Sequence, residues 1–265
     1  MIAGKEPLEA PMNERLGILD WGIGGVGILR ALRRRTRQVP VIYLSDSGYT
    51  PYGRLGSGEL ARRVTQALRR LTERGATSII VACNAASTVL DDDDVRRGCA
   101  VPVSGVIEPA LALTRAQGSG SIGILGGART IRSGVYRRGL RRYRRLIVQR
   151  IAQPLSAHVE AGSTGSQRCY TDLERILSPL RALDAVLLAC THYPALAGQI
   201  AARLPGVPLL DPSEWVVERV LSMHALPRRR AADLLLTTGD PSRMRDAAAQ
   251  AWGVELGACR FDSLR

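Results

Sequence analysis

The sequence Ser78-Ile-Ile-Val-Ala-Cys83-Asn-Ala-Ala-Ser87 joins an apolar run, typical of a buried strand, to small polar residues that open a helix. A second such arrangement, Asp184-Ala-Val-Leu-Leu-Ala-Cys190-Thr-His-Tyr193, places its cysteine 107 residues after the first. In both, the cysteine stands where the strand ends and the helix begins. Because helix N-terminal amides favour a thiolate, we expect both thiols to face a cleft and to be chemically active.

The elements around the two cysteines repeat as well. The spacing from Asp20 to Cys83 is 63 residues, and that from Gly126 to Cys190 is 64. Apolar strands alternate with amphipathic helices, which predicts a mainly parallel sheet in each half. We therefore predict an α/β protein with two pseudo-symmetric domains. The first domain comprises residues 15–108 plus 213–265, the second residues 109–212, and residues 1–14 form a flexible N-terminal lead.

The expected elements can be given by their residue numbers. The strands are 16–20, 39–44, 78–82, 120–127, 146–151, 184–189 and 233–237. The helices are 27–37, 58–74, a short one near 87, 130–143, 172–183, and one on each side of the last strand. We expect the segment after residue 212 to rejoin the first domain.

Ligands of such folds bind outside the carboxyl ends of the strands, so the cleft between the domains is the expected active site. Two thiols that face one carbon atom form an acid–base pair, because one can remove a proton while the other returns a proton to the opposite face. Asp20 ends its strand at the level of Cys83, and both an N-cap role and a catalytic role fit it. His192 follows Cys190 by two residues and could share its proton.

Several cofactor classes find no support in the sequence. Lys5 is the only lysine, and it lies ahead of the first strand, a poor place for the Schiff base of pyridoxal phosphate. The turn Gly22-Ile-Gly-Gly-Val-Gly27 lacks the lysine of a P-loop, and a short glycine-rich run is weak evidence for dinucleotide binding, so a tight strand–helix turn close to a small ligand is the better interpretation. The cysteines lack the spacing of metal ligands, so we expect no metal and no cofactor.

The chain is strongly basic, with a net charge of +13 from 37 basic and 24 acidic residues. Its arginines gather at 33–37, 137–150 and 228–230, but aromatic residues are few and no nucleic-acid motif is present. We therefore expect solvated helix faces and no nucleic-acid partner. The aspartates at 91–94 predict a solvated loop. Unpatterned cysteines, with no signal segment and no membrane-spanning stretch, indicate a cytoplasmic protein.

Further motifs are spread from Gly17 to Asp262. They are Gly17-Ile-Leu-Asp20, Gly24-Gly25, Pro51-Tyr-Gly53, Val81-Ala-Cys-Asn84, Gly105-Val-Ile-Glu-Pro109, Thr130 with Ser133 and Tyr136, Pro154, Val159-Glu160, Cys190-Thr-His-Tyr-Pro194 and Leu236-Thr-Thr-Gly-Asp240. In order and spacing they resemble the glutamate racemase family, within the cofactor-independent aspartate/glutamate racemase superfamily. The resemblance implies two flavodoxin-like domains with the active site between them, and the supply of a D-amino acid for cell-wall peptidoglycan biosynthesis.

The resemblance also implies roles for individual residues. Cys83 and Cys190 would be the acid–base pair, and Asp20 would assist the first thiol. His192 would assist the second thiol, with Glu160 nearby. The substrate-binding residues that it implies are Trp21, Pro51, Tyr52, Gly53, Asn84, Ala85, Thr130 and Thr191.

The chain departs from the family pattern beside the thiols. Trp21 and Ala85 stand where the family has Ser and Thr, while Gly127 and Gln153 stand where it has Thr and Cys. The first two changes delete hydroxyls that contact the substrate in the family, and each lost hydrogen bond to a charged group costs about 1.5–3 kcal/mol. Two such losses would weaken glutamate binding by a factor on the order of 100, which favours a larger or more apolar substrate side chain.

We predict a pyridoxal-independent amino-acid racemase or epimerase, an isomerase whose partner is a small carboxylic acid, with a homodimer allowed. Two alternatives stay open. One is a decarboxylase or isomerase of the same superfamily that acts on another carboxylic acid. The other is a non-catalytic binding protein built on a racemase scaffold.

Overall fold

The protein is described by a computed structural model that covers residues 14–118, 120–143, 146–223, 226–227 and 231–264. The predicted N-terminal lead up to residue 13, with Lys5, lies outside the described residues. The arginines at 144–145 and 228–230 also lie outside them.

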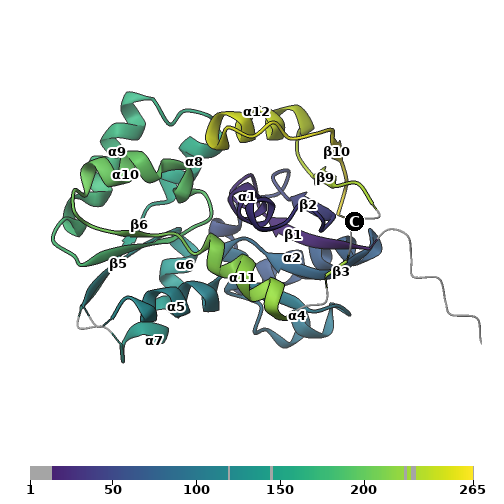
Figure 1. Ribbon diagram of the computed structural model, residues 1–265, viewed down its shortest axis with the longest axis horizontal. Coiled ribbons are helices and arrows are strands. Elements are labelled where there is room, and N and C mark those ends of the chain that lie inside the picture. Colours follow the sequence, from purple (N-terminus) through teal and green to yellow (C-terminus); the bar gives the residue numbers. More distant parts are fainter. Residues whose placement is uncertain (1–13, 119, 144–145, 224–225, 228–230, 265) are drawn as a thin grey trace, which may run out of the picture.

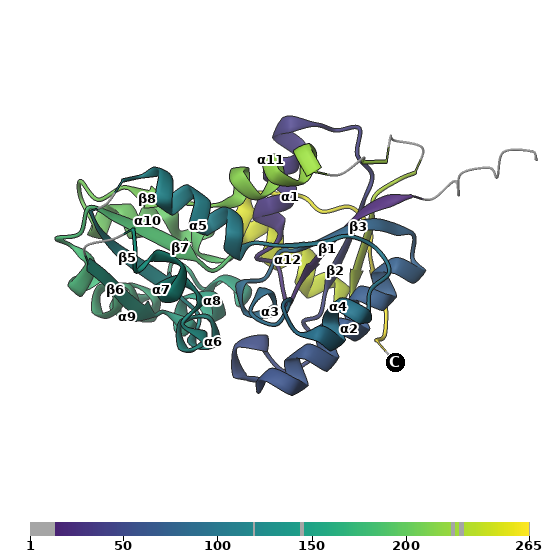
Figure 2. The same ribbon diagram turned by 90° about the horizontal axis from the view of Figure 1, so that it is seen from below.

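Two parallel sheets form the centre of the molecule and lie side by side along its long axis (Figure 1, Figure 2). The first has six strands in the order β10-β9-β2-β1-β3-β4, and the second has four in the order β6-β5-β7-β8. Every strand pair among the described residues is parallel. This arrangement confirms the predicted α/β class with two flavodoxin-like units.

The strands of the six-stranded sheet are β1 (Arg15–Asp20), β2 (Val41–Ser45), β3 (Ala76–Val81), β4 (Val103–Gly105), β9 (Leu234–Thr237) and β10 (Cys259–Phe261). Those of the four-stranded sheet are β5 (Ser121–Gly126), β6 (Leu146–Ile151), β7 (Ala185–Ala189) and β8 (Leu209–Leu210). Both cysteines singled out in the sequence therefore follow an interior strand, β3 or β7.

Helices connect and cover the strands. On the side of the six-stranded sheet they are α1 (Val26–Arg35), η1 (Tyr52–Arg54), α2 (Ser57–Glu73), α3 (Asn84–Ser87), α4 (Asp93–Arg97), α11 (Ser213–Met223) and α12 (Pro241–Trp252). On the side of the four-stranded sheet they are α5 (Ile107–Ala116), α6 (Ala128–Ser133), α7 (Val135–Leu140), α8 (Gln153–Glu160), α9 (Gln167–Leu177), η2 (Ser178–Leu180), η3 (Tyr193–Leu196) and α10 (Ala197–Arg203).

Burial explains why these elements form. All residues of β2 and β7 are buried, as expected for parallel strands covered on both faces. In α2 the fully buried residues Leu60, Val64, Leu68 and Leu71 recur every three or four positions. They form one apolar stripe that packs on the sheet, while charged residues occupy the opposite face.

The C-terminal segment returns to the six-stranded sheet. β9 pairs with β2, β10 pairs with β9, and α11 packs against α1 and α5. At the end of α12, Trp252 donates its indole N–H to the carbonyl of Ile23 at 3.0 Å. β9 and β10 thus belong to the sheet that also holds β1 and β3, while the exact domain boundaries remain a prediction.

Two predicted helices were wrong in extent. The helix predicted at 130–143 is divided into α6 and α7, because Gly134 between them has a left-handed conformation with φ 68° that ends α6. The helix predicted at 172–183 is α9, which begins earlier because the Ser166 side chain caps it by accepting from the Cys169 amide. It ends at Leu177, where a 3-10 turn follows.

Two further surface features differ from the prediction or extend it. The aspartates at 91–94 were predicted to form a loop, but Asp92 caps α4 by accepting from the Asp94 amide at 2.9 Å. The last predicted helix, α12, is followed by a short strand, β10, that the sequence did not reveal.

Arginines of α1 are paired at the surface. Arg33 contacts Asp233 at 2.7 Å, and Arg34 contacts Glu214 at 2.6 Å. Such exposed pairs contribute about 0–1 kcal/mol each to stability. That the arginines serve as solvated faces, without a nucleic-acid partner, stays a prediction.

Candidate active site

A small cavity of about 50 Å³ lies at the carboxyl ends of both sheets and contains the two strand-end thiols. Its lining residues are Trp21, Pro51, Tyr52, Gly53, Cys83, Asn84, Ala85, Gly127, Arg129, Thr130, Gln153, Ser156, Cys190, Thr191 and His192. All the predicted site residues except Asp20 and Glu160 are in this set. Those two carboxylates lie behind it, hydrogen bonded to Thr191 and His192 respectively.

Cys83 is a buried thiol at the N-cap of α3, 8% exposed. Burial raises the pKa of this thiol well above its ordinary value, and the nearby Asp20 carboxylate raises it further. The amides of Ala86 and Ala85 act in the opposite direction but are outweighed. Our expectation that helix amides would favour a thiolate here was therefore wrong in net effect, because the loss of hydration disfavours the thiolate more than the amides favour it. This environment favours the protonated form of the Cys83 thiol.

Asp20 holds the turn after β1 and reaches the other sheet. Its carboxylate accepts from the Trp21 amide at 2.7 Å and from the Gly25 amide. The Thr191 hydroxyl, which follows β7, donates to the same carboxylate at 3.2 Å. Complete burial raises the pKa of Asp20, although the charge of His192 lowers it. Asp20 therefore caps the turn and lies near Cys83, while a catalytic role for it stays a prediction.

The glycine turn after β1 serves close packing of the site. A Cβ atom on Gly24 would lie 2.6 Å from the imidazole Nδ1 of His192 and 2.6 Å from the Thr191 hydroxyl. Any other residue there would displace the groups around the second thiol. This close packing explains the glycine at position 24 without a bound dinucleotide.

Cys190 is the first member of a thiol–imidazole–carboxylate chain. Its sulfur lies 3.7 Å from Nδ1 of His192, whose Nε2 lies 2.5 Å from a carboxylate oxygen of Glu160. Burial alone would lower the pKa of His192, but its hydrogen bonds to Cys190 and Glu160 and their charges hold it well above its ordinary value. A charged imidazolium beside a thiol is the arrangement that activates catalytic cysteines.

Glu160 also ties α8 to the opposite sheet. Its carboxylate accepts from the Ile23 amide, in the turn after β1, at 2.8 Å. Together with the bond from Thr191 to Asp20, this contact joins the two sheets behind the thiols. The carboxylate behind each thiol is thus hydrogen bonded to a residue from the other sheet.

The loop of Pro51, Tyr52 and Gly53 is fixed from outside the cavity. The Tyr52 hydroxyl donates to Asp46 at 2.8 Å, and Arg63 forms a buried ion pair with the same carboxylate at 2.7 Å. The polar end of Tyr52 therefore points away from the cavity, and backbone groups of this loop are what a ligand would meet.

Asn84 and Thr130 supply polar side chains from opposite sheets. The Asn84 side-chain oxygen accepts from the Tyr136 hydroxyl at 2.5 Å, which leaves its amide N–H groups for a ligand. Thr130, on α6, is 2% exposed and lies among the lining residues. Tyr136 belongs to one of the sequence motifs but was not predicted for the site, and its role is to orient Asn84.

A family described as Asp/Glu/Hydantoin racemase matches residues 27–220. The chain belongs to this family. A glutamate racemase of Thermus thermophilus is 35% identical over 255 residues, which cover 94% of this chain and 96% of that protein. Another relative, the glutamate racemase of Deinococcus radiodurans, is 32% identical over 246 residues, which cover 87% and 83% of the two chains.

A solved structure agrees with this assignment. The crystal structure of Thermus thermophilus glutamate racemase in complex with β-chloro-D-alanine has a TM-score of 0.81 at 32% identity, covering 96% of this chain and 99% of that one. Family membership confirms the predicted enzyme class, a racemase that does not depend on pyridoxal phosphate.

Two departures from the racemase pattern form part of the cavity wall. The Trp21 indole N–H donates to the carbonyl of Tyr49 at 2.9 Å, so the ring is held beside the loop that precedes Pro51. Ala85 lies in the first turn of α3, next to Asn84. Neither side chain offers the cavity a hydroxyl.

The sequence did not predict Arg129, Gln153 and Ser156 as lining residues. Gln153 accepts from the Ala128 amide at 3.1 Å and donates to Ser156 at 3.1 Å, so it braces the start of α6. Their positions in the sequence could have indicated this, because each of the three follows the end of β5 or β6 by at most five residues. The site lies at the carboxyl ends of these strands.

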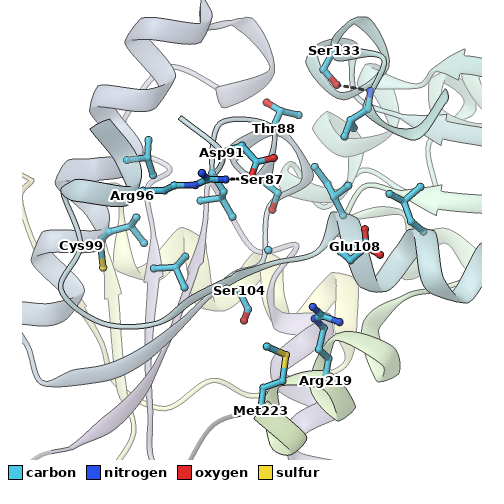
Figure 3. Close-up of a pocket in the computed structure, with 18 of the residues that line it drawn as sticks. Ser87, Thr88, Asp91, Arg96, Cys99, Ser104, Glu108, Ser133, Arg219 and Met223 are labelled. Carbon is cyan, nitrogen blue, oxygen red and sulfur yellow. Dashed lines mark hydrogen bonds and ion pairs between the residues drawn. The ribbon is translucent and has the colours of Figure 1, made fainter. Parts of the chain in front are cut away.

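A larger cavity of about 810 Å³ lies behind α3, between α4, α5 and α11 (Figure 3). Arg96 points toward Asp91 on one side of it, and Arg219 and Met223 of α11 line the other. Neither Cys83 nor Cys190 lines this cavity, which separates it from the smaller cavity that contains both thiols.

Two properties of the described residues bear on other predictions. No helix in this part of the chain is long and apolar enough to cross a membrane. In the same residues, no group of three or more His, Cys, Asp or Glu side chains is placed to hold a metal ion.

Proposed function

We propose that this protein racemises glutamate, or a closely related amino acid, by moving protons between the α-carbon and the thiols of Cys83 and Cys190. The observation that carries the proposal is that the two thiols line one small cavity from different sheets, each backed by its own carboxylate. The names of the relatives support glutamate as the first substrate to test.

The proton transfer follows from the different settings of the thiols. In one direction the Cys190 thiolate removes the α-hydrogen as a proton: an S–H bond forms, the C–H bond breaks, and its electron pair stays on the substrate. The Cys83 thiol gives its proton to the opposite face and becomes a thiolate. In the other direction the two cysteines exchange roles, and proton exchange with solvent restores the starting state.

The surroundings of the cavity lower the barrier without an electron sink. An amino-acid α-hydrogen is a very weak acid, so the reacting groups must be positioned and shielded from water in advance. Such positioning can lower a barrier by about 7–11 kcal/mol. The hydrogen bonds from Ile23 to Glu160 and from Thr191 to Asp20 support this positioning, because they hold the two sheets together behind the thiols.

The test is incubation of the protein with L-glutamate or D-glutamate in heavy water, read by chiral chromatography and mass spectrometry. We expect each enantiomer to give the other, with one deuterium at the α-carbon of the product and no loss of carbon dioxide. Racemisation should be abolished by either Cys83→Ser or Cys190→Ser. The matched control is Cys259→Ser, because Cys259 is a free cysteine that does not line the cavity. Racemisation that persists in both single variants would refute the two-thiol mechanism, and a product lighter by carbon dioxide would identify a decarboxylase.

A location in the cytoplasm, a homodimer and a contribution to cell-wall precursor synthesis accompany this proposal. Gel filtration combined with light scattering would test the homodimer.

A further inference from the structure

Arg129 places an unneutralised positive charge at the cavity. It lies on α6, after β5, and is one of the residues that line the cavity with the two thiols. Its guanidinium donates to the carbonyl of Leu55 at 3.0 Å, to the Ser57 hydroxyl at 3.1 Å and to the Thr88 hydroxyl at 3.0 Å. All three acceptors are uncharged, and no carboxylate of the described residues pairs with Arg129.

This environment favours an anionic ligand. A partly buried cation without a counter-ion is poorly solvated, and burial lowers the pKa of Arg129 accordingly. A guanidinium has five N–H donors, and the three acceptors leave two of them unused. A guanidinium also presents these donors as a planar fork that matches a carboxylate.

We propose that Arg129 binds the side-chain carboxylate of the substrate and so selects amino acids that carry a second negative group. The inference rests on the proposed racemase function of the same cavity. Trp21 and Ala85 favoured a larger or more apolar substrate from sequence alone, but Arg129 provides a positive charge that such a side chain could not use. The charge compensates for hydroxyls that this chain lacks.

A purely structural role is the alternative, because the same hydrogen bonds join α6 to Leu55, Ser57 and Thr88 of the other sheet's side. The two roles differ in what they predict. A structural clamp acts equally on every substrate, whereas recognition of a carboxylate acts only on substrates that carry one.

The first experiment compares L-glutamate with L-glutamine by α-hydrogen exchange in heavy water. Arg129→Met should raise KM for glutamate roughly 10- to 100-fold, as for the loss of one charged hydrogen-bonded pair, with a smaller change in kcat and little change for glutamine. Arg129→Lys should recover part of the loss. Arg132→Met removes an exposed arginine from the same helix and should behave like the wild type. The proposal would be overturned if Arg129→Met impaired the exchange of glutamate and of glutamine equally. It would also be overturned if Ser57→Ala impaired the exchange of glutamate selectively.

The second experiment separates this inference from the racemase function. If the wild type exchanges no α-hydrogen, the proposed function fails, and calorimetric titration with glutarate, a dicarboxylate without an α-amino group, decides the role of Arg129. Binding to the wild type that weakens at least about 10-fold in Arg129→Met supports it. Absence of glutarate binding, or equal binding to both proteins, overturns it.

Discussion

Glu160→Gln removes the charge behind the second thiol while keeping the size of the side chain. The glutamine oxygen can still accept from the Ile23 amide and from His192, as the Glu160 oxygen does at 2.8 and 2.5 Å. What disappears is the negative charge that helps to hold the pKa of His192 well above its ordinary value. The imidazolium beside Cys190 should therefore lose its proton at lower pH.

The expected size of the effect follows from the kind of hydrogen bond that is changed. A hydrogen bond to a charged group contributes about 1.5–3 kcal/mol and a neutral one about 0.5–1.5 kcal/mol, a difference of about 1–2 kcal/mol. That difference corresponds to a fall of roughly 5- to 30-fold in kcat/KM at neutral pH, and the His192 pKa should fall with it. Because enantiomers have equal free energies, kcat/KM must fall equally in both directions.

The stability of the variant should depend on pH in a definite direction. The pKa of His192 is raised in the folded protein, so its contribution to stability is complete below the unfolded value near ~6.5 and is lost as pH rises through the folded pKa. Glu160→Gln should therefore be least stable, relative to the wild type, at acidic pH. The difference should shrink in alkaline solution.

The assay combines pH profiles of kcat/KM in both directions, NMR titration of the His192 ring and urea unfolding at several pH values. Glu218→Gln, an exposed change on α11, is the matched control. If the His192 pKa and the pH profile of Glu160→Gln match those of the wild type, the assignment of Glu160 as the partner of an activating imidazolium is refuted.

Two further changes test the walls of the cavity. Trp21→Ser combined with Ala85→Thr restores the hydroxyls of the racemase family and should raise kcat/KM for glutamate, roughly 10- to 100-fold if both hydrogen bonds form; no gain would count against our account of the departures. Gly24→Ala would place a Cβ atom 2.6 Å from His192 Nδ1, so we expect a loss of about 1–3 kcal/mol in unfolding free energy and a large loss of activity. The control is Gly56→Ala, because a Cβ atom added at Gly56 would meet no other atom within 4 Å. A Gly24→Ala protein as active as the Gly56→Ala protein would contradict the packing argument.

The parts of the fold that sequence predicts are those with local signals. The apolar runs before Cys83 and Cys190 predict β3 and β7 because parallel strands buried on both faces are continuous hydrophobic segments. The break at Gly134 was missed because a glycine within an otherwise helical pattern shows its left-handed conformation only in the folded backbone.

The parts of the site that sequence predicts less well are those that depend on tertiary contacts. Arg129 reaches the cavity because α6 packs against Leu55 and Ser57, and nothing in its own neighbourhood of the chain reports those acceptors. The pKa of Cys83 was expected to fall at a helix N-terminus. Whether desolvation or the amides prevail depends on how deeply the thiol is buried, which its spacing from other residues does not determine.

The two cysteines occupy equivalent places in a repeated topology, yet their surroundings are chemically different. Cys83 is buried beside a carboxylate, which favours its protonated form, whereas Cys190 lies beside an imidazolium. A two-thiol racemase needs this difference, because one thiol must begin as the acid and the other as the base. Burial makes the largest contribution at Cys83 and the charge of Asp20 adds to it, while Glu160 pairs with the imidazole beside Cys190. Both carboxylates also accept hydrogen bonds from residues of the opposite sheet. The contacts that join the two sheets behind the thiols therefore also set the charges around His192, which is why the Glu160→Gln experiment measures both the His192 titration and the rate.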